Sequence, residues 1–187
     1  MVKDLLFQYI DNLKKTMDRL NIENFEDTVN TLFEAIKRAS QIFMMGNGGS
    51  GATAAHFACD LNKCLSYGRK KRIKAICLND NMPIVSAYSN DISYDCIFVE
   101  QLKNFMKKDD IVLGLSGSGN SKNVIEAVEY ANEYNAISIG FSGFDGGILA
   151  KTAQQSIVVN IDDMQIVEDI HLILTHVIMQ ILEKKLK

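Results

Sequence analysis

Residues 42–61 read IFMMGNGGSGATAAHFACDL, a short apolar run followed by a glycine-rich segment and then by a helical pattern. The four apolar side chains, Ile42 to Met45, fit a strand that is buried on both faces, as in a parallel sheet. The glycines that follow let the backbone approach a ligand, and they lie where a helix is expected to begin. This succession of strand, glycine loop and helix predicts an α/β fold.

The same succession recurs along the chain. Strand-like apolar segments fall at 42–45, 73–78, 111–115, 136–141 and 156–159, separated by helical patterns at 50–66, 84–89, 95–107 and 121–134. Helical spacing also marks 4–20, 25–39 and 164–186. We therefore expect a three-layer α/β/α sandwich around a parallel sheet of about five strands, with a long C-terminal helix. Residues 1–187 are expected to form a single domain, in which the N-terminal helical pair, 1–40, packs on the core or on a second copy.

Composition and charge narrow the function classes. The chain is 47% hydrophobic and 23% charged, with a formal net charge of −3, which is ordinary for a soluble globular protein. It offers no basic surface for nucleic acid, and no apolar run approaches the roughly 20 residues that cross a bilayer. We expect no nucleic-acid partner and no membrane partner. We expect a cytoplasmic location. The cysteines lack CxxC spacing, which favours reduced core thiols over disulfides or a zinc site; they are Cys59, Cys64, Cys77 and Cys96.

Two loops rich in glycine and serine follow two of the predicted strands, at 46–50 and 116–121. In open α/β sheets, ligands bind beyond the carboxyl ends of the strands. The second loop has three serines and no lysine, so it is a neutral cradle suited to the phosphate of a small sugar. Neither loop has the GK[ST] ending of a nucleotide-binding P-loop. Ordinary strand-to-helix turns are the alternative, but the presence of two such loops favours a phosphate site.

A second group of residues suggests acid–base chemistry. His56 and Asp60 are four residues apart on one predicted helix, so they share a face. On the last helix, Glu168 and His176 lie about 80° apart around the axis, whereas His171 lies about 140° from His176. These histidines and carboxylates suit either a metal site or acid–base catalysis. A surface pair and a core histidine are the alternatives, and spacing alone does not choose.

Five segments together resemble the sugar isomerase (SIS) domain family, and within it the phosphoheptose isomerase branch. They are GNGGSGATAAHFACDL, NDISYDCIFVEQL, GLSGSGNSKNVIEAVEYA, GFSGFDGGILAKTA and VEDIHLILTHVIMQILE. The resemblance extends from the N-terminal helices to the C-terminus. Its most specific part is the pairing of GNGGS, ahead of a histidine and an acidic residue, with SGSGNS after the third strand.

The resemblance implies an aldose–ketose isomerase of heptose biosynthesis that acts on sedoheptulose 7-phosphate through an enediol(ate). It also implies a homotetramer with active sites at subunit interfaces, each with a possible Zn²⁺ ion. The family's substrate-binding positions fall on Asn47, Gly48, Gly49, Ser50, Asn90, Asp91, Ser116, Gly117, Ser118, Asn120 and Ser121. Its metal and acid–base positions fall on His56, Asp60, Glu168 and His176. Among these, we expect Asp60, Glu168 and His176 to be catalytic, with Asp60 or Glu168 as the base and His176 as its partner. A metal ion on the two histidines that polarises the carbonyl is the alternative mechanism.

Three departures from the family leave the substrate open. The chain has Asp60 where the family usually has glutamate, Glu168 where it usually has glutamine, and Gly117 where it usually has threonine. Asp60 has a shorter reach, and the extra charge of Glu168 favours a divalent cation. An isomerase for another sugar phosphate is therefore one alternative. Another is a non-catalytic SIS-domain protein that binds sugar phosphate or associates with a replication initiator, but the complete set of histidines and carboxylates favours an enzyme.

Overall fold

A parallel sheet of five strands forms the centre of the computed structural model, which describes residues 1–187. The order across the sheet is β2-β1-β3-β4-β5, and every neighbouring pair is parallel. The direction of winding reverses between β1 and β3, so the loops that follow these two strands flank the usual ligand crevice of such sheets. The strands are β1 (Gln41–Gly46), β2 (Lys74–Cys77), β3 (Ile111–Ser116), β4 (Ile137–Gly143) and β5 (Gln155–Val159).

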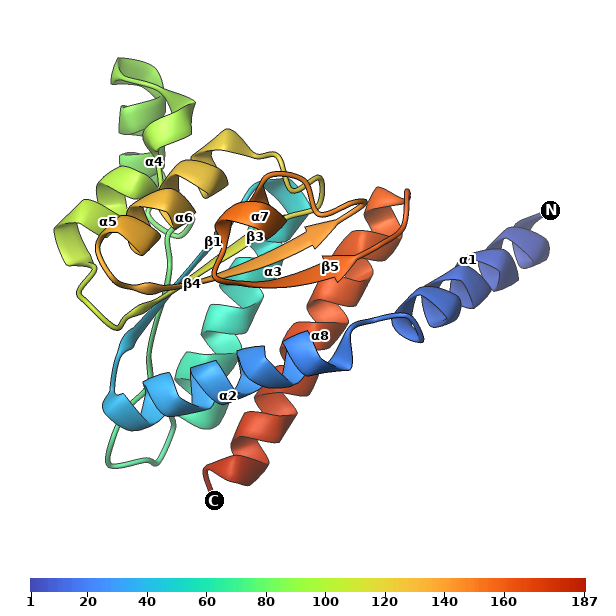
Figure 1. Ribbon diagram of the computed structural model, residues 1–187, viewed down its shortest axis with the longest axis horizontal. Helices are drawn as coiled ribbons and strands as arrows, with labels where there is room; N and C mark the ends of the chain where they lie inside the picture. Colours follow the sequence, from blue (N-terminus) through green and yellow to red (C-terminus); the bar gives the residue numbers. More distant parts are fainter.

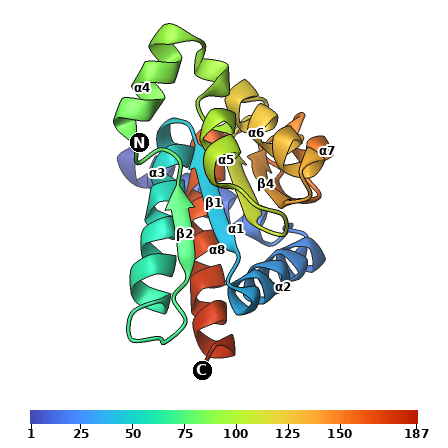
Figure 2. The ribbon, with the colours of Figure 1, turned by 90° about the vertical axis from the view of Figure 1, so that its left-hand side faces the viewer.

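Helices cover both faces of this sheet (Figure 1), so the predicted three-layer α/β/α sandwich is confirmed. Helices α2, α3 and α8 pack on one face, and α5, α6 and α7 pack on the other. Helix α1 extends away from the body at one end, and α4 projects from the carboxyl edge of the sheet (Figures 1 and 2). The helices are α1 (Val2–Met17), α2 (Ile22–Arg38), α3 (Gly48–Cys59), α4 (Met82–Asp91), α5 (Val99–Phe105), α6 (Lys122–Glu133), α7 (Leu149–Thr152) and α8 (Met164–Lys185).

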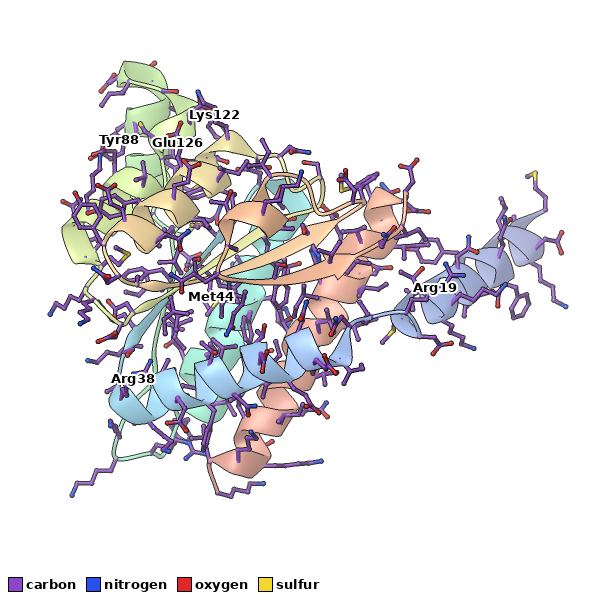
Figure 3. All side chains as sticks on the ribbon, in the orientation of Figure 1. Arg19, Arg38, Met44, Tyr88, Lys122 and Glu126 are labelled. Carbon is purple, nitrogen blue, oxygen red and sulfur yellow. The ribbon has the colours of Figure 1, made fainter.

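Strand β1 divides the core into two halves. Because side chains alternate along a strand, Ile42 and Met44 enter the cluster beneath α2, α3 and α8, while Phe43 and Met45 enter the cluster beneath α5 and α6. All four are fully buried, and burial of each such side chain stabilises the fold by about 1.5–3 kcal/mol. Figure 3 shows Met44 in the middle of the sheet, between the helical layers.

The long helix α8 corrects one expectation. By length and composition this helix is apolar enough to cross a bilayer, whereas the expectation from the sequence is that no segment is. One row of its apolar side chains is buried in the core instead: Ile166, Ile170, Leu174, Ile178 and Leu182. A core helix can be as long and as apolar as a membrane span, and the packing of α8 in the core accounts for its apolar side chains.

Other differences from the expected elements are local. Helix α3 begins at Gly48, inside the glycine segment, and continues into a π-helical turn, Asp60–Leu65. The short helix α7 is not among the expected elements, because four residues are too few to show a helical period. The expectation of core thiols is wrong for Cys59 and Cys64, which are exposed, although all four cysteines are free as expected.

His171 is the buried histidine of α8. Its side chain lies between α8 and β4, where the Nε2 atom is 3.3 Å from the Ser142 carbonyl oxygen and the Nδ1 atom has no partner. Burial lowers the pKa of His171 to about 4, so the ring is neutral at pH 7. The two histidines of α8 therefore face different surroundings, as their spacing predicted.

This buried ring predicts an acid-sensitive fold. His171 takes up a proton near pH 6.5 in the unfolded chain but only near pH 4 in the folded chain. The neutral, buried ring therefore makes its full contribution to the free energy of unfolding above pH 6.5, and this contribution is lost as the pH falls toward 4. Between pH 6.5 and 5 the loss is about 2 kcal/mol. Urea unfolding of His171→Leu at both pH values is expected to show a smaller acid loss, by about that amount, than the unaltered protein. Equal losses would contradict this account.

Candidate active site

The glycine loop after β1 is shaped by its neighbours. Gly48 has a φ of +52°, in the left-handed region that favours glycine. Asn79 holds the end of β1 from the adjacent loop, because its side-chain amide donates to the Gly46 carbonyl at 2.8 Å and its oxygen accepts from the Gly46 N–H at 3.3 Å. The first N–H groups of α3 are consequently presented at the carboxyl edge of the sheet, where they suit an anion.

Asn47 belongs to a polar network that the sequence did not reveal. Its side-chain oxygen accepts hydrogen bonds from the Tyr94 hydroxyl at 2.8 Å and the Asn123 amide at 3.0 Å. Tyr94 comes from a short 3₁₀ turn after α4, and Asn123 is a buried residue near the start of α6. The network fixes the orientation of Asn47 between the two glycine loops. The only sequence signal for Asn123 was its place two residues after the serine-rich loop.

The serine-rich loop after β3 lies beside the glycine loop, because β1 and β3 are paired up to Gly46 and Leu115. The Ser116 hydroxyl donates to the Ser121 hydroxyl at 3.0 Å, and the Gly119 N–H closes a turn on the Ser116 carbonyl at 2.9 Å. Ser121 is the N-cap of α6. Hydroxyl and N–H donors without a charged side chain thus line this loop, as a neutral anion cradle would require.

Open space adjoins this cradle. A pocket of about 520 Å³ lies next to Ser118 and Asn120. Its other lining residues come from the ends of β4 and β5 and include two carboxylates; they are Phe144, Asp145, Asn160, Ile161 and Asp162. A small ligand can therefore reach the serine-rich loop from solvent.

Three of the predicted acid–base residues meet between α3 and α8. His56 and His176 approach with their Nε2 atoms 3.0 Å apart. The Asp60 Oδ2 atom lies 3.5 Å from His56 Nε2 and 4.0 Å from His176 Nε2. The Asp60 side chain is 14% exposed and the two histidine side chains are 50% and 41% exposed, so the group is open to a ligand on one side.

This group fits a metal ion. Its three ligand atoms all lie within 4.8 Å of one another. Two nitrogens bound to one tetrahedral zinc ion lie about 3.3 Å apart, close to the 3.0 Å between the histidines. Two histidines and one carboxylate are also a known ligand set of catalytic zinc sites, which keep one position open for water or substrate.

The fourth expected residue, Glu168, is not part of this group. It lies eight residues before His176, about 12 Å along the helix. A Cβ atom added to Gly49 would lie 2.6 Å from the Glu168 carboxyl carbon, so this carboxylate packs on the first turn of α3. A negative charge is favourable at that helix end. Glu168 is therefore placed at the glycine loop, outside the group of three side chains that could hold a metal ion.

Two other predicted residues also lie apart from the loops. Asn90 and Asp91 are exposed at the end of α4, where the Asn90 amide donates to Asp91 at 2.7 Å. The loop and the histidine group are separated as well, since Ser50 precedes Asp60 by ten residues, or about 15 Å of helix. Within one chain, α3 thus has the glycine loop at one end and the group of His56, Asp60 and His176 at the other.

The geometry predicts which side chains bind a metal ion. Titration of metal-free protein with Co²⁺, followed by calorimetry, is expected to show at least a tenfold loss of affinity in His176→Ala, because one of three nitrogen or oxygen ligands is removed. Glu168→Gln is the matched control on the same helix and is expected to retain the affinity. An equal loss in both variants would show that Glu168 moves into the group on binding.

Known proteins are similar to this chain in both sequence and fold. The family model described as "SIS domain" matches residues 7–143. The probable phosphoheptose isomerase of Thermoplasma acidophilum is 34% identical over 95% of this chain and 97% of its own length. The phosphoheptose isomerase of Helicobacter pylori (strain ATCC 700392 / 26695) is 30% identical over 98% and 95%. The structure of the phosphoheptose isomerase from Neisseria gonorrhoeae, 24% identical, superposes with a TM-score of 0.90 over 98% of this chain and all of that one. That likeness shows the fold.

Proposed function

The chain belongs to the SIS domain family, in the branch of the phosphoheptose isomerases, and we propose that it converts sedoheptulose 7-phosphate to D-glycero-D-manno-heptose 7-phosphate. The observation that carries the proposal is the group of His56, Asp60 and His176, which supplies a base and a proton carrier within 4.8 Å. The neutral loop at 116–121 would hold the phosphate through its hydroxyl and N–H groups.

The reaction moves a proton between C1 and C2 of the sugar by way of an enediol(ate). Asp60 is the proposed base, because its carboxylate is largely shielded from solvent and adjoins both histidines. His176 would carry a proton to and from the sugar oxygens. Glu168, the other candidate base in the sequence, packs instead on Gly49 beside the loop, where it is better placed to orient the sugar chain.

A Zn²⁺ ion is the proposed cofactor, held by His56, Asp60 and His176. When bound, it would supply positive charge that polarises the sugar carbonyl and stabilises negative charge on oxygen. The His176 Nε2 atom cannot hold a metal ion and a proton at the same time, and an Asp60 oxygen bound to the metal ion cannot also act as the base. The pH dependence of kcat with and without added Zn²⁺ therefore distinguishes the two roles of His176.

We further propose a homotetramer with active sites between subunits. One apolar side of α1 is exposed, through Val2, Leu5, Leu6, Phe7 and Ile10, and a second copy would cover it. The separation of about 15 Å along α3 between Ser50 and Asp60 is a second argument. If the loop came from one subunit and the histidine group from another, the two could lie close enough to contact the same sugar phosphate.

Turnover tests the isomerase directly. The purified protein is expected to convert sedoheptulose 7-phosphate, and His176→Ala to lower kcat at least 10²-fold, because loss of a general acid–base group typically costs 10²–10⁴-fold. Gln180→Ala, which alters an exposed residue one turn further along α8, is the control and should retain activity. Absence of turnover with or without Zn²⁺, while the sugar phosphate still raises Tm, would contradict the isomerase and indicate a binding protein.

The oligomer has its own test. Sedimentation equilibrium of the unaltered protein is expected to give four times the chain mass of 20.9 kDa. Leu6→Glu should shift the distribution to smaller species, because it places a charge in the exposed apolar side of α1. Gln8→Glu adds the same charge to the opposite side of α1 and should leave the mass unchanged. A monomer in the unaltered protein would exclude the tetramer.

A further inference from the structure

Beside Gly117, in the middle of the serine-rich loop, the Met164 side chain fills the space that a side chain on residue 117 would take, so any such side chain requires Met164 to move. A Cβ atom added to Gly117 would overlap the Met164 sulfur and lie 3.2 Å from its terminal methyl carbon. Met164 is the first residue of α8 and is partly buried. The thioether therefore occupies the position that a side chain on residue 117 would take.

Met164 is held in this position by the start of its helix. The Asp163 side chain caps α8 by accepting hydrogen bonds from the N–H groups of Gln165 at 3.1 Å and Ile166 at 3.2 Å. One turn later, Val167 packs directly on Gly143, where a Cβ atom would overlap it. The Gly143 N–H in turn donates to the Gly117 carbonyl at 2.9 Å. The start of α8 is thus linked to the loop through Gly143.

The position of residue 117 gives this contact its significance. It lies between Ser116 and Ser118, in the loop that the proposed function assigns to the phosphate. Because residue 117 is bonded directly to both serines, a group in its side-chain space would lie beside a phosphate held by them. A hydroxyl there would donate a hydrogen bond, whereas a thioether is apolar, polarisable and at most a weak acceptor. At position 117 of this chain, the space beside the two serines is therefore filled by an apolar group from α8.

We propose that Met164 is a specificity-determining residue at the phosphate end of the site, acting as a pair with Gly117. The thioether forms an apolar wall that keeps water from one side of the cradle, and the loop N–H and serine hydroxyl groups bind the phosphate monoester from the other. This inference rests on the proposed function for the identity of the ligand. It concerns binding alone, since Met164 carries no group that can move a proton.

A four-protein comparison tests the pair: the unaltered protein, Met164→Ala, Gly117→Thr and the double variant. KM and kcat are measured with sedoheptulose 7-phosphate, and the rise in Tm is measured with inorganic phosphate. Met164→Ala is expected to raise KM at least fivefold with kcat within twofold, because water enters beside the phosphate. Gly117→Thr is expected to raise KM at least tenfold, because threonine pushes the thioether into the cradle.

The double variant is expected to return KM to within threefold of the unaltered value, because threonine fills the vacated space and its hydroxyl reaches the phosphate. If the two single effects instead multiply in the double variant, the pairing is wrong. Met164→Leu, which keeps an apolar wall of similar volume, should stay within twofold of the unaltered KM. If Gly117→Thr fails to fold, Met164→Ala and Met164→Leu by themselves still test whether an apolar side chain at position 164 lowers KM. Equal KM values in these two variants would overturn the proposed apolar wall.

Two controls separate this inference from the proposed reaction. Met179→Ala removes another methionine of α8, away from the loop, and should change neither KM nor the rise in Tm with phosphate. If no protein turns over sedoheptulose 7-phosphate but the rise in Tm follows the expected order, the reaction is wrong and the Met164 wall stands. If turnover is normal and the rise in Tm is the same in every variant, the wall is wrong and the reaction stands.

Discussion

The site depends on the parallel pairing of β1 with β3 at the centre of the sheet. These two strands are neighbours although a helix, a strand and two further helices separate them in sequence. Their pairing brings two glycine-rich loops to one edge, at the point where the sheet reverses its winding. Both strands are buried on both faces, so a slip of one residue would place every side chain on the wrong side. Burial in the core therefore positions the two loops.

The contact between α3 and α8 supplies the second half of the chemistry. Both helices cover the same face of the sheet, and their histidines approach to 3.0 Å. The core row of α8 sets the rotation of that helix, so His171 turns inward to β4 while His176 faces α3. Two histidines on one helix thus differ in environment because one lies in the core row and the other beside it. The apolar packing that stabilises the fold also selects which histidine can act.

Glycines at the carboxyl edge are constrained by side chains of α8. Glu168 packs on Gly49, Met164 on Gly117 and Val167 on Gly143. The first two turns of α8 therefore form one wall of both loops, and changes there alter the site without altering the loop sequences. Two of the three positions at which the sequence resemblance implies a departure, Gly117 and Glu168, lie at this wall. The proposed influence of Met164 on phosphate binding rests on this packing.

The sequence by itself determined the α/β class, the five strands, most of the helices and the pairing of His56 with Asp60, because hydrophobic period and i, i+4 spacing are local properties. Only the tertiary structure decided that His176 joins this pair while Glu168 lies at Gly49, and that Tyr94 and Asn123 hold Asn47. It also decided that Met164 fills the space above Gly117. Such contacts depend on the register and rotation with which distant helices pack, and no local pattern encodes these quantities.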